Sequence, residues 1–209
     1  YEKIHTAVLG KIKAQGGLKA AYALWSLDGA LKRGQLEGAG QRVGLGLRLR
    51  CALGRPALKS LRVGLEARTG GRIGFFISGG APLSPEIGQF LTCLGFSVFE
   101  GYGLTETTAA THINTRAGNK VGTVGRPVKG ARCKIAPDGE VLVQGPMVME
   151  GYYKRPEANA EVFSAGWFHT GDIGQIDGDG FLKITDHKKD LIITAAGKNI
   201  APQNVENHV

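Results

Sequence analysis

The chain has 209 residues, 42% of them apolar, which suffices for one large or two small domains with an ordinary hydrophobic core. Its net charge of +8 is concentrated in residues 1–72, where 14 Lys or Arg face 4 Asp or Glu, whereas residues 73–209 carry 12 against 14. No apolar run reaches the roughly 18 residues of a membrane-spanning helix. Three widely spaced cysteines without a CxxC pair argue against a disulfide framework or zinc site, so we expect a cytoplasmic protein.

The basic first third narrows the class of partner. A basic face can serve nucleic acid, an anionic membrane surface or solubility. No helix-turn-helix, zinc-finger or aromatic RNA-binding pattern accompanies the charge, so we expect no nucleic-acid partner. A solvated face and peripheral contact with the inner face of a membrane stay open as explanations.

Helical spacing of apolar residues comes first along the chain. It predicts helices between residues 3 and about 60, with breaks at Gly16-Gly17 and at Gly38 to Gly40. We assign residues 1–70 to a basic helical segment of a larger domain.

Residues 71–120 are predicted to form a βαβ unit. A short apolar strand covers Ile73 to Ile77, and a second covers Phe96 to Phe99. Between them, Ser84 is a good N-cap, Pro85 suits the first helical position, and Gly95 ends the helix. The two strands should therefore be parallel neighbours.

A glycine-rich turn is predicted after each strand, Gly79-Gly80 after the first and Gly101 to Gly103 after the second. Ligands of open α/β sheets bind outside the carboxyl ends of the strands. Tyr102 could stack on a flat ring there, and Thr105 with Glu106 could hold a phosphate and its magnesium. From these residues alone, a glycine turn followed by a threonine-capped helix is an equal alternative.

Antiparallel hairpins are predicted further along. Alternating strands flank Asp138-Gly139 and again Asp177 to Gly180, so residues 121–185 should form a small β subdomain. Residues 186–209 open with a charge cluster, pass through an apolar strand, and begin a helix after Pro202. Without its surroundings, "KKD" at 188–190 would be a solvated charge run.

Four motifs in a fixed order point to a family. They are "SGGAPLS" at 78–84, "EGYGLTET" at 100–107, "GWFHTGD" at 166–172 and "DHKKDLIITAAGKNIAPQNVE" at 186–206. The series resembles the AMP-forming adenylate-forming enzymes, which include acyl-CoA synthetases, adenylation domains and firefly-type luciferases. The helical first 70 residues are most similar to long-chain fatty acyl-CoA synthetases. The resemblance implies an α/β fold, α+β within this chain, comprising part of the large N-terminal domain and, at 186–209, the hinge and start of the C-terminal domain.

The resemblance also implies roles for individual residues. The backbone of Gly80-Ala81-Pro82 would pack on adenine and Tyr102 would stack on it. Thr105 would contact the α-phosphate, Glu106 would hold Mg²⁺, and Asp172 would accept hydrogen bonds from the ribose hydroxyls. The residues expected to bind nucleotide or coenzyme A are Gly79, Gly80, Ala81, Pro82, Gly101, Tyr102, Gly103, Asp172, His187 and Gly197.

The last motif contributes the remaining expectations. By resemblance, Lys189 lies at the hinge of the C-terminal domain and Gly197 borders the tunnel for the pantetheine arm of coenzyme A. His187 departs from the family, which usually has an arginine that bonds the ribose. Histidine can donate one hydrogen bond but lacks the arginine fork, so nucleotide affinity or domain rotation should differ.

The activity implied is a two-step ligation of a fatty acid, ATP and coenzyme A with Mg²⁺, through an acyl-adenylate. Two alternatives stay open: a fatty acyl-AMP ligase that serves a carrier protein, and a non-catalytic nucleotide-binding module. The family's phosphate loop would lie upstream of Tyr1 and its catalytic lysine downstream of Val209. Residues 1–209 alone are therefore expected to be inactive.

Overall fold

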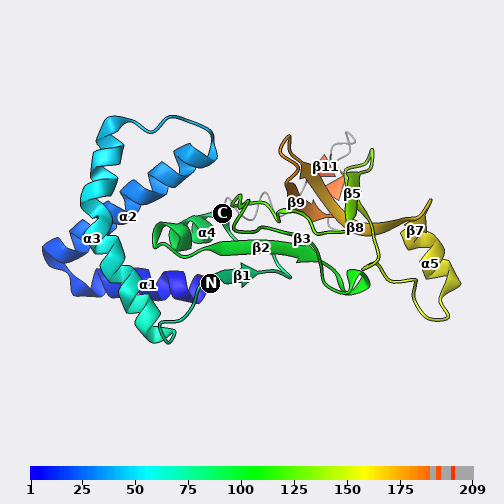
Figure 1. The fold of residues 1–209 in the computed structure, drawn as a ribbon, viewed down its shortest axis with the longest axis horizontal. Helices are drawn as coiled ribbons and strands as arrows, with labels where there is room; N and C mark the ends of the chain where they lie inside the picture. Colours follow the sequence, from blue (N-terminus) through cyan, green and yellow to red (C-terminus); the bar gives the residue numbers. More distant parts are fainter. Residues whose placement is uncertain (189–191, 194–198, 201–209) are drawn as a thin grey trace. The chain divides into compact units, whose positions relative to one another are not determined.

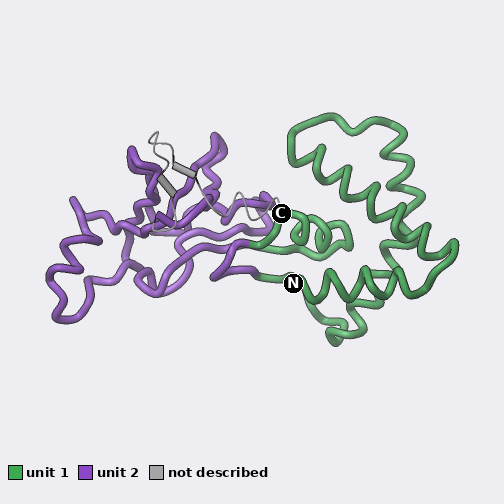
Figure 2. Tube along the Cα trace, turned by 180° about the vertical axis from the view of Figure 1, so that it is seen from behind, with its two compact units in different colours: residues 1–77, 83–99 green, residues 78–82, 100–209 purple. Residues whose placement is uncertain are grey.

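The computed structural model describes residues 1–188, 192–193 and 199–200 (Figure 1). The chain forms two compact units, coloured separately in Figure 2. Unit 1 comprises residues 1–77 and 83–99, and unit 2 comprises residues 78–82 and 100–209. The four segments expected from the sequence stay a prediction. They follow the domain boundaries of a family, whereas these two units are defined by compactness.

Unit 1 is built from helices α1 (Glu2–Gln15), α2 (Gly17–Gly38), α3 (Leu45–Arg68) and α4 (Pro85–Cys93). The predicted breaks at Gly16 and after Gly38 are confirmed, and Gly16 has a φ of 60° that favours glycine. Helix α3 runs past the predicted limit near residue 60, because Leu61 and Leu65 in its last turns pack into the core.

The core of unit 1 is apolar and centres on α4. Phe90 and Leu91 are fully buried there, and the His5 ring lies edge-on to Phe90 at 4.6 Å between ring centroids. Burying such side chains stabilises the fold by roughly 1.5–3 kcal/mol each. The buried members of this cluster are Leu27, Leu65, Ile87, Phe90, Leu91, Leu94, Phe96 and Val98.

The βαβ unit is present with shifted strands. Strand β1 is Phe76–Ser78, which begins three residues later than predicted and is shorter. Strand β2 is Val98–Gly103, which begins two residues later and is longer. The Phe76 N–H donates to the Ser97 carbonyl, and Gly79 lies against the Gly101 carbonyl, so the strands advance together and are parallel as predicted. Helix α4 begins at Pro85 after Ser84, also as predicted.

The predicted turn at Gly101 to Gly103 is wrong, because these residues belong to β2. Strand β3 (Ala110–Ile113) pairs with them and lengthens the strand. A Cβ atom at Gly103 would lie 2.0 Å from the Ala109 carbonyl oxygen, so glycine is needed for the close approach of two backbones. The sheet shifts register between Tyr102 and Gly103, which is typical of a bulge beside a functional site.

Unit 2 is mainly antiparallel sheet. Strand β4 (Arg126–Pro127) pairs with β3, completing the order β1-β2-β3-β4. The second sheet has the order β5-β6-β8-β7, with β9 also on β8. Its strands are β5 (Arg132–Ile135), β6 (Glu140–Gln144), β7 (Phe163–Ser164), β8 (Trp167–Ile176) and β9 (Leu182–His187). Strands β10 (Ile192–Ile193) and β11 (Asn199–Ile200) form a separate antiparallel pair.

Both hairpins expected in unit 2 are confirmed. Strands β5 and β6 pair across Asp138-Gly139, and β8 and β9 pair across Asp177 to Gly180. Helix α5 (Pro156–Val162) was not predicted, because it is short and buries no residue, although Pro156 at its start is a helix signal. The helix expected after Pro202 lies outside the described residues. None of the helices described is long and apolar enough to cross a bilayer.

Candidate nucleotide-binding site

Tyr102, Asp172 and His187 meet in unit 2. The Tyr102 hydroxyl donates to Asp172 Oδ2 at 2.5 Å, and His187 Nδ1 lies 2.5 Å from Asp172 Oδ1. A carboxylate only accepts, so His187 Nδ1 must carry a proton. Asp172 is 3% exposed, whereas the His187 side chain is 54% exposed. A buried carboxylate thus holds an aromatic ring on one side and an accessible imidazole on the other.

Strand pairing places Asp172 beside His187, whereas Tyr102 belongs to the other sheet. Asp172 on β8 lies directly opposite His187 on β9. Tyr102 on β2 lies opposite His112 on β3, with ring centroids 6.2 Å apart. Thr170 Oγ1 accepts the Asp172 N–H at 3.1 Å and donates to the Val141 carbonyl at 2.7 Å, which orders the part of β8 before Asp172.

Burial determines the protonation of the Tyr102 and His112 rings. Loss of solvation raises the pKa of Tyr102 well above its ordinary value, and the adjacent Asp172 charge raises it further. The phenol therefore stays protonated and remains a donor to Asp172. Burial lowers the pKa of His112 to about 4, so this ring is neutral at pH 7.

Thr105 and Glu106 form a short 3-10 turn, Thr105–Thr107, directly after β2. The alternative of a threonine-capped helix, which the residues alone left open, does not hold, because the chain enters β3 at Ala110 and Thr111 belongs to that strand. Thr107 Oγ1 accepts the Leu104 N–H at 2.9 Å and serves only the turn. Thr105 is exposed and accessible to a ligand.

Glu106 is held from two sides. Its backbone carbonyl accepts the Met149 N–H at 2.7 Å, and its Oε1 accepts the Tyr152 hydroxyl at 2.7 Å. Mg²⁺ is usually bound by one or two carboxylates together with substrate phosphates and water. No group of three or more metal-ligating side chains occurs among the described residues, so a single carboxylate fits that mode and a closed all-protein site does not.

The segment Gly79 to Pro82 is exposed and carries little side chain. Gly80 has a φ of 82°, which favours glycine, and no atom lies within 4 Å of a Cβ built there. The first glycine of the segment lies against Gly101 of β2, so the exposed backbone neighbours the strand that carries Tyr102. Bare backbone at this place can approach a flat ring closely.

Glu140 organises a second polar cluster that the sequence did not reveal. It is 3% exposed, its Oε1 accepts the Gly171 N–H at 2.9 Å, and its Oε2 lies 3.0 Å from His169 Nδ1 and 2.9 Å from Lys188 Nζ. Burial raises the pKa of Glu140, but these three donors outweigh burial and hold the pKa below its usual range. Lys188 Nζ also pairs with Asp138 at 2.8 Å, so Lys188 is not part of a merely solvated run.

The remaining predicted site residues are not all described. Lys189 and Gly197 lie outside the described residues. Tyr102, Asp172 and His187 are in direct contact, while Thr105 and Glu106 follow Tyr102 on the same segment. Glu140 was missed because only strand register brings it to this place, and Tyr152 because its loop meets Glu106 only in the folded chain. Thr170 lies within the quoted "GWFHTGD" motif, but no role was assigned to it.

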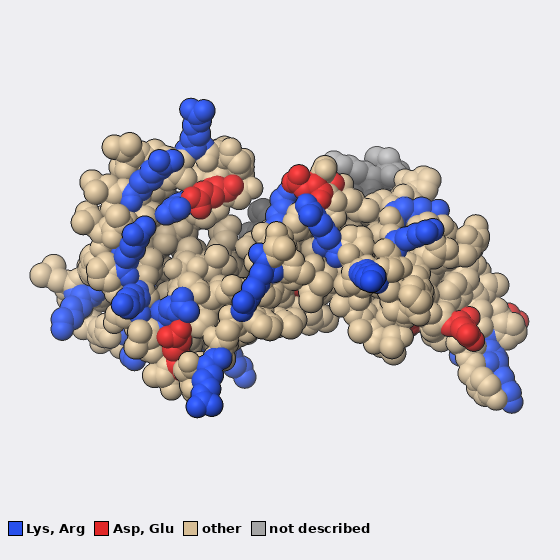
Figure 3. Space-filling model, in the orientation of Figure 1, with Lys and Arg blue, Asp and Glu red and all other residues tan. Residues whose placement is uncertain are grey.

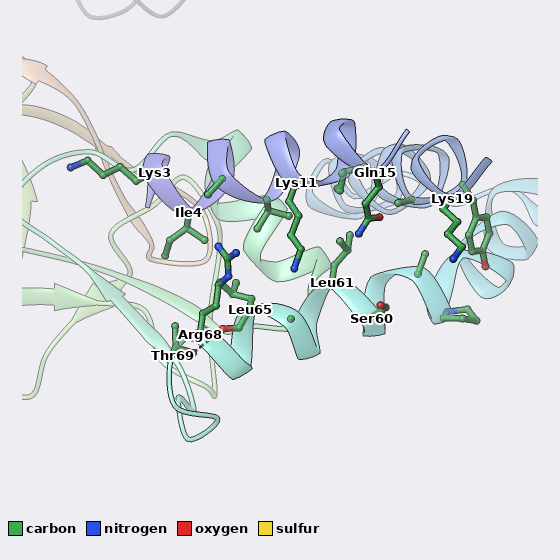
Figure 4. Close-up of a pocket in the computed structure, with 18 residues that line it drawn as sticks. Lys3, Ile4, Lys11, Gln15, Lys19, Ser60, Leu61, Leu65, Arg68 and Thr69 are labelled. Atoms are coloured by element: carbon green, nitrogen blue, oxygen red, sulfur yellow. Dashed lines mark hydrogen bonds between the residues drawn. The ribbon is translucent and has the colours of Figure 1, made fainter. Parts of the chain in front are cut away.

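A cavity of about 930 Å³ lies in unit 1 among α1, α2 and α3 (Figure 4). Its floor includes Val8, Ile12 and Leu61, and Figure 4 shows Lys11 and Arg68 pointing into the space between α1 and α3. Among the described residues, no Asp or Glu lines this cavity. The cationic lining residues are Lys3, Lys11, Lys19 and Arg68.

Comparison with known proteins places this arrangement in a family. The family described as AMP-binding enzyme matches residues 15–153, which is more than half of the chain. The chain belongs to the AMP-binding enzyme family.

Relatives of this AMP-binding enzyme include long-chain acyl-CoA ligases. It is 47% identical over 145 residues to the long-chain-fatty-acid--CoA ligase FadD15 of Mycobacterium bovis, covering 69% of this chain and 24% of the relative. It is 35% identical to the peroxisomal long chain acyl-CoA synthetase 6 of Arabidopsis thaliana, covering 99% of this chain and 30% of that one. The chain thus spans between about a quarter and a third of these relatives' lengths.

Solved structures agree in fold. The unliganded O-succinylbenzoate coenzyme A synthetase of Bacillus subtilis matches with a TM-score of 0.61 at 34% identity, covering 71% of this chain and 36% of that one. The same enzyme in complex with ATP and magnesium matches with a TM-score of 0.59 at 32% identity, covering 71% and 34%. The predicted fold class, a mixed helix and sheet portion of the N-terminal domain of adenylate-forming enzymes, is confirmed.

Proposed function

We propose that the full-length protein is an AMP-forming ligase that joins a long-chain fatty acid to coenzyme A. The observation that carries the proposal is the contact of Asp172 with both Tyr102 and His187, which lie on motifs that resemble the family. An aromatic ring beside a buried carboxylate suits a nucleoside, because the ring can stack on a base. The carboxylate has lone pairs left to accept from a ribose diol. The named relatives support the long-chain acid.

In the first step the fatty acid carboxylate attacks the α-phosphorus of ATP. A new oxygen to phosphorus bond forms, the bond to the β-phosphate breaks, and pyrophosphate leaves. The bare backbone of Gly79 to Pro82 and the Tyr102 ring would hold adenine, Asp172 and His187 the ribose, and Thr105 the α-phosphate. Such groups lower the barrier by positioning the reactants and complementing the charge that develops.

Magnesium would be held at Glu106 together with the phosphates of ATP, where it supplies charge neutralisation. In the second step the sulfur of coenzyme A attacks the acyl carbon. The anhydride bond breaks, AMP leaves with the electron pair, and the thiol proton is released. Gly197 would border the path of the coenzyme A arm and Lys189 the hinge, as the resemblance implies.

A substrate panel on the full-length enzyme tests this proposal. We expect pyrophosphate release and acyl-CoA formation in equal amounts, largest for long-chain acids. Pyrophosphate release without acyl-CoA, but with transfer to a holo-carrier protein, would instead favour a fatty acyl-AMP ligase. Absence of both products would favour a non-catalytic nucleotide-binding module.

We further propose that the protein is cytoplasmic and docks on an anionic phospholipid surface through unit 1. Figure 3 shows Lys and Arg side chains distributed over the helices of this unit. In the described chain, Lys3, Lys11 and Lys19 on the cavity rim have no carboxylate partner, so lipid phosphates would complement them. The free state of Cys51, Cys93 and Cys133 fits a reducing compartment.

Liposome co-sedimentation tests the docking proposal. Each basic side chain near an anionic surface contributes about 1 kcal/mol, so Lys11→Glu combined with Lys19→Glu should weaken binding at least about ten-fold. The matched control reverses the charge of exposed Lys154 in unit 2 and should bind nearly as wild type. Equal binding to neutral and anionic vesicles, or insensitivity to salt, would contradict the proposal.

A further inference from the structure

Glu140 joins two segments that are far apart in the chain. One is Gly171, directly before Asp172 in β8, and the other is Lys188, which follows His187 directly. Asp172 and His187 are also hydrogen-bonded to each other. The Glu140 carboxylate, the Gly171-Asp172 segment, His187 and Lys188 therefore form a closed ring of contacts. Neither oxygen of Glu140 is left without a donor.

The geometry separates the tasks of the two oxygens. Oε1 accepts the Gly171 N–H at 2.9 Å, which fixes the backbone one residue before Asp172. Oε2 lies 3.0 Å from His169 Nδ1 and 2.9 Å from Lys188 Nζ. His169 lies on β8 and Lys188 follows β9, so Oε2 joins the two strands that carry Asp172 and His187.

Both the strand pairing and the exposure of the side chains set the Glu140 carboxylate apart. Strand β6 pairs Glu140 with Ile173 of β8, and the register shifts between Glu140 and Leu142, so the pairing is irregular where the side chain reaches Gly171. The Glu140 side chain is 4% exposed, while its partner Lys188 is 46% exposed. A buried carboxylate without hydrogen-bond donors would destabilise the fold. We therefore attribute the strand irregularity to the need for these donors to reach Glu140.

We propose that Glu140 is a positioning residue that sets the spacing between Asp172 and the His187-Lys188 segment. It does not touch the nucleotide and acts through the backbone of Gly171 and the ammonium of Lys188. This inference rests on the proposed function, because it assumes that Asp172 and His187 meet the ribose. It assigns to Glu140 a role in nucleotide affinity, with no role toward the fatty acid.

The test uses the full-length enzyme with Glu140→Gln, Lys188→Met and the double variant. Gln can still accept the Gly171 N–H through its carbonyl oxygen, but it removes the charge that holds Lys188 and His169. A lost hydrogen bond to a charged group corresponds to about a ten-fold effect or more. We therefore expect the KM for ATP and the Kd for AMP to rise about ten-fold in Glu140→Gln, with the KM for the fatty acid unchanged.

The double variant and two controls complete the design. If Lys188 acts through Glu140, adding Lys188→Met to Glu140→Gln should weaken AMP binding no further. Glu140→Asp should recover part of the affinity, since it restores the charge. Glu161→Gln, which removes an exposed carboxylate on α5, should leave the KM for ATP at the wild-type value.

The outcomes are distinguishable. An active wild type in which Glu140→Gln leaves the Kd for AMP unchanged, or raises the KM for ATP and fatty acid equally, overturns the positioning role alone. A wild type that binds AMP but makes no acyl-adenylate overturns the proposed function, and the Kd comparison still decides on Glu140. A wild type that neither binds AMP nor releases pyrophosphate overturns both.

Discussion

The two units differ in what they bury. In unit 1, Ser26 is the one polar residue among the buried residues described, and the rest of its interior is apolar. Unit 2 buries carboxylates, a histidine and several threonines beside its apolar strands. Its buried polar residues are Ser78, Glu100, Thr107, Thr111, His112, Asn114, Thr123, Glu140, Asp172 and Asp186.

This difference in buried residues predicts that unit 1 contributes mainly stability and that unit 2 contributes ligand binding. Apolar burial is not directional and stabilises a fold in proportion to area, so the interior of unit 1 needs no particular atoms in particular places. Buried polar groups must each find a partner, which fixes positions and is costly to disturb. Mutations in unit 1 should therefore change mainly stability, and mutations in unit 2 should change ligand binding and pH dependence.

The largest effect is expected from Phe90→Ala in the core of unit 1. Phe90 is fully buried, and truncation of such a ring costs about 3–5 kcal/mol through lost contacts and a cavity. Hydrogen exchange should show faster exchange at the amides of α4, while the KM for ATP stays the same at low temperature. Leu18→Ala, at a residue 90% exposed on α2, is the control and should leave exchange at α4 unchanged. A large change in the KM for ATP would break the comparison.

A smaller effect is expected from acid, through His112 in unit 2. The unfolded chain binds a proton at His112 near pH 6.5, whereas burial lowers the pKa in the folded state to about 4. The unfolded state therefore binds more protons between these values, and stability falls as pH decreases from 6.5 to 4, by about 3 kcal/mol. Urea unfolding at pH 7 and pH 4 measures this loss.

His112→Asn is the matched variant for the acid experiment. It removes the titrating ring, so the decline of the free energy of unfolding between pH 6.5 and 4 should become shallower by about the same 3 kcal/mol. Glu140 and Asp138 have lowered pKa values, so their contribution declines from about pH 5 downward in wild type and variant alike, and the difference between the two chains isolates His112. An identical pH slope in wild type and variant would contradict the burial argument.

The smallest effect is expected from His187→Arg. Histidine makes one contact to Asp172, and its side chain is 54% exposed, so an arginine has room to reach the same carboxylate and adds further donors. Turnover should stay intact or rise. A large loss of turnover would show that the imidazole has a role that arginine cannot replace. Lys154→Arg, at an exposed position in unit 2, controls for a general effect of an added guanidinium.

Local signals predicted much of the fold. Turn residues at Asp138-Gly139 and the Ser84-Pro85 helix start were sufficient, because each sets the backbone within a few residues. The end of β2 could not be predicted in this way, since Gly103 stays in a strand only through the close approach of Ala109. That approach depends on pairing with β3, which no local sequence pattern predicts.

The residues of the candidate site also divide into those that the sequence predicts and those that it does not. Tyr102, Asp172 and His187 could be named from motifs in a fixed order. The contact of Asp172 with His187 follows from strand pairing, and that of Tyr102 with Asp172 is a side-chain bond between two sheets. Glu140 could not be named, because it stands in a hairpin that reads as ordinary alternation and its partner Lys188 is 48 residues away. Their pairing requires the register of β6 on β8 and of β8 on β9 together.

The central claim is that Asp172 organises a nucleotide site. The most direct measurement is the Kd for AMP, by calorimetry, of the full-length protein and its Asp172→Asn variant. Asparagine keeps the shape but loses the charge, and weakening the two bonds that Asp172 would accept from the ribose hydroxyls should lower AMP affinity by roughly two orders of magnitude. Asp179→Asn, at an exposed turn, should bind as wild type. Equal AMP affinity in wild type and Asp172→Asn would contradict the account.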